Sequence, residues 1–526
     1  MFSSDTFYYI IGLLYNLVNL ILGTSTSTIF GISVPTRLIS FFYILVYFTN
    51  SLISFTIIFI DREKPKRAIS WLLVFMLFPF IGLIVYLFLG RRWKSTTLKE
   101  KLSSGIQDNI KTSLDKYDGP YSNMVEMVSK ENGLPVFLYN EIEIFKDGTE
   151  KFESLLKDID EAKHHIHLEY YIAMSDKIGR KIFDRLIEKS KSGVKVRVVL
   201  DKFGSRNFSR KYIKEIRDAG VELLFYTAYD ACFTRIIDFS LNHRNHRKIV
   251  VIDGVIGYLG GNNISDNYIG LGNMGYWRDT HIRVRGELVA GLQALFLDDF
   301  YSVLSHNKKT SKWELDRKFK KMVDNYGNEK DFLSYFPENK VTNYLPMQMV
   351  YIGPGSPFSA IEHLFLKMIS EAEESIYITT PYFVPSDSLT ESLKIAINSG
   401  VSVNIIFPGQ YDHSPVGHAC ITYLKELLDE GANIYFYDKD SYTHDKTMLV
   451  DSKMFTVGSS NFDVRSFYYN FEVNAVVYDE KTSKLIENNF KEDIAKSKQL
   501  TLEEYNKGSK LRHFLESFFR LFSLLF

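Results

Sequence analysis

The chain has 526 residues, and its 63 Lys and Arg residues balance its 63 Asp and Glu residues, so the formal net charge is zero. This length allows two to four domains at roughly 100 to 200 residues each. A balanced charge argues against a dedicated nucleic-acid binder, which needs a broad basic face. The two cysteines, Cys232 and Cys420, are too few for a disulfide scaffold and fit a reducing compartment.

Two long uncharged stretches lie near the N-terminus. Residues 38–60 and 68–90 each run for 23 residues without a charge. At a rise of about 1.5 Å per residue, each is long enough to cross a hydrocarbon core of about 30 Å. They predict a transmembrane hairpin within a membrane region of residues 1–95. A shorter apolar segment in the same region, 7–22, is expected to be a third span, an interfacial helix or an extra anchor.

The alternative for the two stretches is a helical hairpin buried in a soluble core. Soluble cores seldom use two consecutive uncharged helices of this length, so the membrane interpretation is favoured. Basic residues follow the second stretch, and by the positive-inside rule they favour a multi-pass protein of the cell membrane whose catalytic part lies on the cytoplasmic side.

A linker, residues 96–135, is expected before a part of mixed charge in which the sequence repeats. Three pairs of segments match: 161–172 with 371–382, 192–199 with 399–406, and 219–226 with 430–437. Each has the pattern of a helix end or a glycine followed by a β-branched strand. A period near 200 residues is too long for a solenoid, so the sequence predicts two α/β domains, 136–330 and 331–500, related by a pseudo-two-fold axis.

The same polar residues occur once in each repeat. A histidine is followed at offsets of 2, 7 and 17 by a lysine, an aspartate and an asparagine: His246, Lys248, Asp253 and Asn263 in the first repeat, and His444, Lys446, Asp451 and Asn461 in the second. A glycine pair or Gly-Ser lies just before each asparagine. Two occurrences at matching places are very unlikely to arise by accident.

This spacing suits phosphoryl transfer. Residues two apart on a strand point to one face, so the histidine and lysine of each motif project together. A lysine and an asparagine from each repeat can neutralise the oxygens of a phosphodiester, which is the main electrostatic need of such a reaction. One histidine can then attack phosphorus while the other protonates the leaving oxygen and later deprotonates the acceptor.

A metal site is the rival interpretation, because the strand with His164, His165 and His167 could bind zinc. A lysine two residues after each motif histidine argues against a metal there, since an ammonium group repels a cation. Solvated or hydrogen-bonded side chains are the favoured interpretation of the three strand histidines. No cofactor is therefore expected.

The doubled H-x-K-x4-D motif with a trailing G-[GS]-x-N resembles the signature of the phospholipase D superfamily. Further segments resemble bacterial cardiolipin synthases, among them 165–171, 244–248, 276–281 and 380–385. The resemblance implies two α/β sandwich halves that share one active site. It also implies transfer of a phosphatidyl group between two phosphatidylglycerol molecules through a phosphohistidine, which yields cardiolipin and glycerol, with phosphatidylglycerol and anionic lipids as partners and no nucleic acid.

By motif position, the resemblance makes the two sets of histidine, lysine and aspartate the active site, with His246 as the nucleophile and His444 as the acid and base. Asp253 and Asp451, at strand ends, are expected to fix loop geometry. Asp279 and Glu472 are candidates to orient a catalytic imidazole, although each could be an ordinary surface carboxylate. Asp445 departs from the family pattern and is expected to point away from its neighbouring histidine and lysine.

The tail, residues 501–526, combines basic residues with an apolar helical face. Such a helix can lie in the lipid headgroup layer, or it can pack on the protein's own surface. Two other functions stay open: a membrane-tethered phospholipase D or phosphodiesterase that uses water as the acceptor, and a non-catalytic membrane scaffold. The sequence indicates neither the acceptor nor the oligomeric state.

Overall fold

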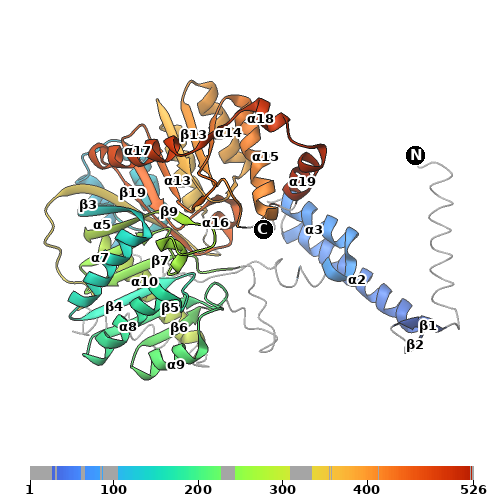
Figure 1. The fold of residues 1–526 in the computed structure, drawn as a ribbon, viewed down its shortest axis with the longest axis horizontal. Coiled ribbons are helices and arrows are strands. Elements are labelled where there is room, and N and C mark those ends of the chain that lie inside the picture. Colours follow the sequence, from blue (N-terminus) through green and yellow to red (C-terminus); the bar gives the residue numbers. More distant parts are fainter. Residues whose placement is uncertain are drawn as a thin grey trace. The chain divides into compact units, whose positions relative to one another are not determined.

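A computed structural model of the chain describes residues 26–29, 32–60, 65–82, 86, 105–226, 243–307, 334–354, 356, 358–412, 414–521 and 523. The chain forms two compact units, residues 1–91 and 92–526. Figure 1 labels the helices and strands of both units. The apolar segment 7–22 lies outside the described residues.

The N-terminal unit contains a short hairpin of β1 (Thr26–Ile29) and β2 (Ile32–Pro35), followed by helices α2 (Thr36–Ile60) and α3 (Pro65–Leu77). Helix α2 covers the first uncharged stretch. Helix α3 covers the start of the second and ends at Leu77, because the proline at position 79 disfavours helical geometry for the residue before it. Most of the remainder of that stretch lies outside the described residues.

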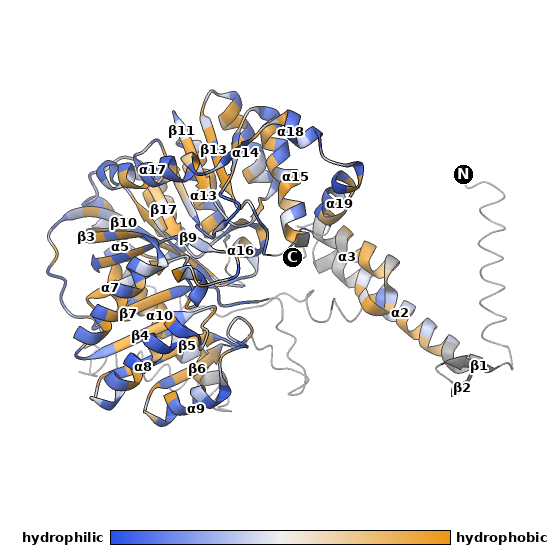
Figure 2. Ribbon diagram, viewed as in Figure 1, coloured by the Kyte–Doolittle hydropathy of each residue, from blue (hydrophilic) through white to orange (hydrophobic). Residues whose placement is uncertain are grey.

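The two apolar segments of this unit contact each other. Asn50 Nδ2 donates a hydrogen bond to the Pro79 carbonyl at 2.8 Å, and the rings of Tyr43 and Phe80 pack edge to face with centroids 4.9 Å apart. Apolar residues make up most of α2, whose hydropathy is coloured in Figure 2. Its large side chains are exposed, as for Phe48 at 67%. Among the described residues, no helix combines the length and the apolar character needed to cross a membrane.

The second unit is built on a sheet of sixteen strands that consists of two equivalent halves. The first half contains β3 (Phe137–Asp147), α7 (Gly148–Glu161), β4 (His165–Tyr170), α8 (Lys177–Lys191), β5 (Lys195–Asp201), α9 (Arg210–Asp218), β6 (Glu222–Tyr226), β7 (Lys248–Ile252), β8 (Ile256–Gly260), the 3-10 helix η2 (Asp266–Ile269), β9 (Tyr276–Gly286) and α10 (Leu288–Asn307). The second half contains β10 (Tyr344–Ile352), α13 (Ala360–Ser370), β11 (Ser375–Thr379), β12 (Phe383–Val384), α14 (Asp387–Asn398), β13 (Ser402–Phe407), α15 (Ser414–Glu430), β14 (Asn433–Phe436), β15 (Ser441–Thr443), β16 (Thr447–Val450), β17 (Met454–Gly458), β18 (Phe462–Asp463), α16 (Val464–Tyr468), β19 (Glu472–Val477), α17 (Glu480–Ala495) and β20 (Lys498–Leu500).

Strand order confirms the duplication. Outward from the middle of the sheet, the first half runs β3-β9-β8-β7-β4-β5-β6 and the second runs β10-β19-β17-β16-β11-β13-β14. The two series meet where β3 and β10 pair antiparallel, with Tyr139 opposite Tyr344. Because these strands hold the same place in each series, their antiparallel pairing generates the predicted pseudo-two-fold relation. The three matched sequence pairs form β4 with β11, β5 with β13, and β6 with β14.

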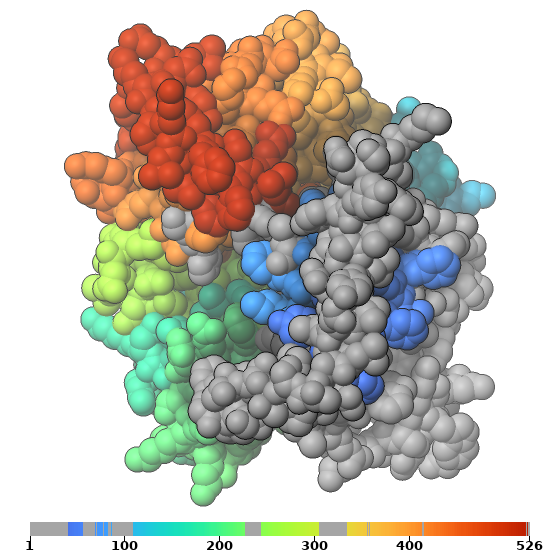
Figure 3. Space-filling view, turned by 90° about the vertical axis from the view of Figure 1, so that its right-hand side faces the viewer, coloured from blue at the N-terminus to red at the C-terminus, as the bar shows by residue number. Residues whose placement is uncertain are grey.

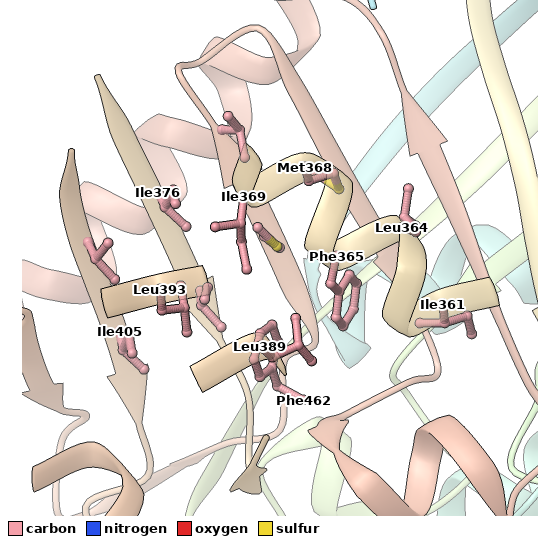
Figure 4. Close-up of a cluster of buried hydrophobic side chains, with 14 of the residues drawn as sticks. Ile361, Leu364, Phe365, Met368, Ile369, Ile376, Leu389, Leu393, Ile405 and Phe462 are labelled. Carbon is pink, nitrogen blue, oxygen red and sulfur yellow. The ribbon is translucent and has the colours of Figure 1, made fainter. Parts of the chain in front are cut away.

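The halves share one apolar core, so they fold as a single unit. One cluster of buried side chains draws Ile249 and Leu259 from the first half and Leu449 and Val457 from the second. Helices cover the other face of each half. In Figure 4, the side chains of α13 at positions 361, 364, 365, 368 and 369, which is the spacing of one helical face, belong to one cluster with Ile376 of β11, Leu389 and Leu393 of α14, and Ile405 of β13.

The expected linker, 96–135, holds two helices, α5 (Gly105–Asp115) and α6 (Ser122–Asn132). Helix α6 is part of the fold, because Met124, Val125 and Val128 enter the core of the second half. Gln348 of β10 also donates a hydrogen bond to the Val125 carbonyl at 2.9 Å. The described part of this segment therefore packs as a structural layer.

The C-terminal tail packs beside α15 through helices α18 (Leu502–Asn506) and α19 (Lys510–Arg520), drawn in red next to the orange elements in Figure 3. The Phe519 ring stacks on His418 at 6.0 Å, and Arg520 bonds Glu426 at 2.7 Å. The opposite face of α19 stays exposed, with Leu511 at 68% and Phe514 at 64%. Both sequence interpretations of the tail thus retain a physical basis.

Candidate active site

The two histidine motifs are brought together by backbone pairing between the halves. Strand β15, which leads into His444, pairs in parallel with residues 276–278 of β9, and His444 N donates to the Arg278 carbonyl at 2.8 Å. In the other half, His246 N donates to the Phe471 carbonyl at 3.0 Å. Each histidine therefore lies beside the residue that precedes the other half's carboxylate.

His246 pairs with Glu472 of the second half. Its Nδ1 lies 3.0 Å from each carboxylate oxygen and 3.1 Å from the Ser459 carbonyl. All these neighbours only accept hydrogen bonds, so Nδ1 carries the hydrogen and the lone pair of the neutral ring is at Nε2. The predicted orienting role of Glu472 thus has a direct contact.

His444 pairs with Asp279 of the first half, at 2.7 Å between Nδ1 and Oδ2. The same nitrogen lies 3.3 Å from the Tyr268 hydroxyl and 2.9 Å from Lys446 Nζ. This imidazole therefore has a carboxylate and an ammonium group as neighbours, whereas His246 has acceptors alone at Nδ1. Asp279 and Glu472 are both fully buried, which excludes the alternative of ordinary surface carboxylates.

The motif lysines lie beside their own histidines. Lys248 Nζ donates to the His246 carbonyl at 2.7 Å, and Lys446 Nζ donates to the His444 carbonyl. Burial lowers the pKa of Lys248 to about 7, and the charge of Lys446 adds to that effect. Burial lowers the pKa of Lys446 as well. An anion bound near these two desolvated amines would stabilise their charged forms.

The two carboxylates differ in protonation. Burial raises the pKa of Asp279 to about 7 even though Lys446 and Lys248 oppose the shift. Burial acts on Glu472 in the same direction, but His246 and Lys248 outweigh it and hold its pKa below the ordinary value. Glu472 is therefore ionised at neutral pH, while Asp279 is close to half protonated.

Both imidazoles are neutral at pH 7 in this environment. Burial lowers the pKa of His246 to about 4, in spite of the charge of Glu472. Burial and then the charges of Lys446 and Lys248 lower the pKa of His444 well below its usual value.

The two carboxylates also differ in one hydrogen-bond donor. In the second half, Ser459 Oγ donates to Glu472 Oε2 at 2.6 Å. The equivalent residue in the first half is Gly261, where an added Cβ would lie 2.0 Å from Asp279 Oδ1. Within the described part of the chain, Asp279 Oδ1 is buried without a hydrogen-bond partner. Glu472 thus gains a stabilising donor that Asp279 lacks.

The motif aspartates bind backbone. Asp253 and Asp451 have φ angles of 52° and 50°. The Asp253 carboxylate accepts the N–H groups of residues 163–165 at 2.8 to 2.9 Å, and Asp451 accepts those of residues 373–375 at 2.7 to 2.9 Å. These bonds agree with the expectation that the aspartates fix loop geometry.

The two asparagines lie behind the histidines. Asn263 Oδ1 accepts the Ile172 N–H at 3.1 Å, and its Nδ2 donates to the Tyr268 hydroxyl at 3.0 Å, which leaves one amide hydrogen for another acceptor. Asn461 Oδ1 is buried without a partner in the described residues. That either asparagine binds phosphate stays a prediction.

Asp445 and the strand histidines belong to the supporting structure. Asp445 accepts the hydroxyls of Thr280 at 2.9 Å and Thr447 at 2.6 Å. His165 Nε2 and His167 Nδ1 contact opposite ends of the Gln293 amide at 2.9 and 2.8 Å. The expectation of hydrogen-bonded strand histidines is confirmed for these two.

Two features were missed by sequence reasoning. One is the set of aromatic side chains around the imidazoles, and the other is the crossed pairing, in which each imidazole contacts the carboxylate of the other half. The Tyr171 ring centroid lies 4.8 Å from that of His246, and the Trp277 centroid lies 5.5 Å from that of His444. Trp277 precedes Asp279 by two residues on β9, so strand alternation was the available signal. The crossing left no local signal, because it depends on pairing between the halves.

Comparison with known proteins gives a consistent assignment. The family described as cardiolipin synthase, phospholipase D-like domain, matches residues 155–274 and 365–494, and the phospholipase D-nuclease N-terminal family matches residues 50–91. The chain is 39% identical to the major cardiolipin synthase of Bacillus subtilis, over 93% of this chain and 99% of that one. It is 36% identical to a cardiolipin synthase of Oceanobacillus iheyensis, over 91% and 98% of the two chains.

Among solved structures, the phosphatidylserine synthase of Haemophilus influenzae superposes with a TM-score of 0.56 at 16% identity, over 77% of this chain and all of that one. This likeness concerns the fold of the duplicated unit. The two family matches and the near full-length relatives show that the chain belongs to the cardiolipin synthase family of the phospholipase D superfamily.

Proposed function

We propose that the protein is a membrane-bound phosphatidyltransferase that converts two phosphatidylglycerol molecules into cardiolipin and glycerol. The observation that carries the proposal is the crossed pair of imidazoles, each bound through Nδ1 to a carboxylate of the other half and each beside a buried lysine. Family membership and the names of the relatives support cardiolipin as the product.

In the first step, Nε2 of His246 attacks the phosphorus of the donor lipid. The bond from phosphorus to the glycerol headgroup oxygen breaks, and that oxygen takes a proton from His444. Free glycerol leaves, and the phosphatidyl group remains on His246 as a phosphohistidine. The two lysines, with Asn263 and Asn461, neutralise the oxygens that carry the developing charge.

In the second step, a hydroxyl of the acceptor phosphatidylglycerol gives its proton to His444 and attacks phosphorus. The bond between phosphorus and His246 breaks, which releases cardiolipin and restores both imidazoles. Atoms balance, because two phosphatidylglycerol molecules contain one cardiolipin and one glycerol.

The environments of the imidazoles support this division of roles. His246 faces an ionised Glu472, so its Nδ1–H stays in place and its Nε2 lone pair is available for attack. His444 faces Asp279, whose pKa of about 7 puts an exchangeable proton next to the ring near neutral pH. A bound phosphodiester adds negative charge and raises the pKa of His444, which favours the protonated form that the first step needs.

The N-terminal unit and the tail are proposed to hold the enzyme at its lipid substrate. The exposed apolar side chains of α2 and the match of residues 50–91 to an N-terminal family of phospholipase D proteins support attachment to the cell membrane. Crossing of the membrane by residues 38–60 and 68–90, and a cytoplasmic catalytic unit, stay predictions. The exposed side chains of α19 add a second apolar surface.

The test is to reconstitute the full chain in phosphatidylglycerol vesicles and identify the products by mass spectrometry. We expect cardiolipin and glycerol in equal amounts from the wild type, neither product from His246→Ala, and a rate about 10² to 10⁴ lower from His444→Ala. Phosphatidic acid plus glycerol would instead establish a phospholipase D that uses water. Absence of lipid turnover would overturn the proposal and favour the scaffold.

A further inference from the structure

Three arginines gather around Tyr171, the aromatic neighbour of His246. We call Arg206, Arg244 and Arg465 the arginine cluster. Arg206 and Arg244 flank one ring, because their guanidinium carbons lie 4.9 and 4.1 Å from the centroid of Phe203. Arg465 lies on α16, and the charge of Arg244 adds to burial in lowering its pKa. The three charges therefore converge on one region.

Tyr171 connects the arginine cluster to the reacting centre. Its ring centroid lies 4.8 Å from that of His246 and 5.7 Å from Lys248 Nζ. Burial raises the pKa of Tyr171, and the charges of all three arginines oppose that shift, so all three lie within electrostatic range of this side chain. The backbone at Gly204 fits closely against this ring, since an added Cβ would lie 2.9 Å from it. One aromatic ring therefore separates the cluster from His246.

The nearest carboxylates are already engaged by backbone. Asp201 accepts the N–H groups of Phe203 and Gly204 at 2.9 Å and that of Asn245 at 3.1 Å. Asp463 caps α16 by accepting the Ser466 N–H at 2.6 Å. In the described part of the chain, Arg206 and Arg244 contact the Phe203 ring and form no ion pair.

Such a cluster is suited to a phosphate group. Arg206 is exposed and Arg244 and Arg465 are half-buried, and like charges gathered in one region repel one another, so a bound anion relieves that repulsion. The planar fork of a guanidinium matches the oxygens of a phosphate better than an ammonium does. The cluster thus has the charge and the geometry for a phosphodiester, at a place distinct from the motif lysines.

The proposed reaction supplies a second phosphodiester, so the inference rests on that proposed function. Two lipids meet in the site, and each brings one phosphodiester. The donor's phosphate is transferred at the motif lysines. The acceptor's phosphate stays intact, and three headgroup carbons separate it from the hydroxyl that attacks. We propose that the arginine cluster binds the phosphodiester of the acceptor lipid, with Tyr171 between this group and the phosphohistidine.

This assignment makes the cluster a determinant of acceptor choice. A lipid held by its phosphate presents its hydroxyl to the phosphohistidine, whereas water and neutral alcohols lack the group that the arginines bind. Loss of the cluster should therefore reduce transfer to phosphatidylglycerol more than transfer to a neutral acceptor.

The experiment measures both transfers in one reaction. The full chain is reconstituted in phosphatidylglycerol vesicles with excess deuterated glycerol, and mass spectrometry follows cardiolipin and deuterium-labelled phosphatidylglycerol. Arg244→Gln and Arg206→Gln are compared with the wild type, with Arg244→Lys as the conservative variant, and with Arg210→Gln as an exposed control on α9. Thermal unfolding of each variant checks its fold.

We expect the ratio of cardiolipin to labelled lipid to fall at least tenfold in Arg244→Gln, to fall less in Arg206→Gln and Arg244→Lys, and to stay at the wild-type value in Arg210→Gln. Equal loss of both products, or an unchanged ratio, in both folded glutamine variants would overturn the inference. If the wild type transfers to glycerol but makes no cardiolipin, or makes neither product, the proposed function itself fails.

Discussion

The two half-sites have the same backbone frame but unlike chemistry. His246 faces Glu472, which is ionised and accepts bonds from Ser459 and Asn470 at 2.6 and 3.1 Å. His444 faces Asp279, whose pKa is raised to about 7. Duplication therefore supplied symmetric positions, and the side chains around the carboxylates made the imidazoles different: one keeps its tautomer, and the other has an exchangeable proton.

The largest effects are expected from the histidines themselves. His246→Ala should abolish turnover, because no nucleophile remains to form the intermediate. His444→Ala should slow turnover by about 10² to 10⁴. Lipid carrying labelled phosphate should label the His444→Ala protein covalently, and acid-labile label should be absent from His246→Ala. Label on His246→Ala alone would reverse the assigned roles.

Replacing each carboxylate with its amide should change the pH dependence of the rate differently in the two half-sites. The wild-type rate should rise with pH through about 4, as His246 loses its proton, and fall above about 7, where both Asp279 and Lys248 lose theirs. Asp279→Asn should make this fall shallower, because only the Lys248 part is left, and Glu472→Gln should keep the Asp279 part while the rate drops about 10- to 100-fold. Identical pH profiles for both variants would contradict the comparison.

Ser459→Ala tests why the carboxylates differ. Without the hydroxyl, Glu472 loses a donor to its charged form, so its pKa should rise towards that of Asp279. We expect a rate loss of about tenfold at neutral pH. In the Glu472→Gln background the same substitution should have little further effect, and additive losses would show that Ser459 acts elsewhere.

The motif aspartates should behave alike in the two halves. Asp253→Asn and Asp451→Asn each replace an acceptor of three backbone N–H groups, so each should lower the free energy of unfolding by about 1 to 3 kcal/mol. Urea unfolding measures the loss. Activity below the transition should stay within a few-fold of wild type, and a thousandfold loss in a folded variant would give them a catalytic role.

The smallest effect is expected from α19, which belongs to the second half alone. Leu511→Ser combined with Phe514→Ser should reduce binding of the full chain to vesicles a few-fold, because both side chains are exposed. Glu503→Gln on α18 is a matched surface control. Unchanged vesicle binding would restrict α19 to its packing against α15.

Sequence reasoning reached the parts of the molecule that local patterns encode. The matched segments around residues 161–172 and 371–382 gave the duplicated strands, and the repeated offsets gave the histidines and lysines. It did not place α6 in the core, because residues 124, 125 and 128 form too short a pattern to distinguish a packed helix from a linker. The partners of the imidazoles depend on pairing between β9 and β15, which no local pattern reports.

The separation of 226 residues between His246 and Glu472 has a consequence for biosynthesis. At about 5 to 20 residues per second, a ribosome needs about 10 to 45 seconds to extend the nascent polypeptide over that distance. During this interval the nucleophile exists without the carboxylate that fixes its tautomer. The complete His246–Glu472 pair therefore arises only after residue 472 has been synthesised, and a product terminated before that residue lacks it.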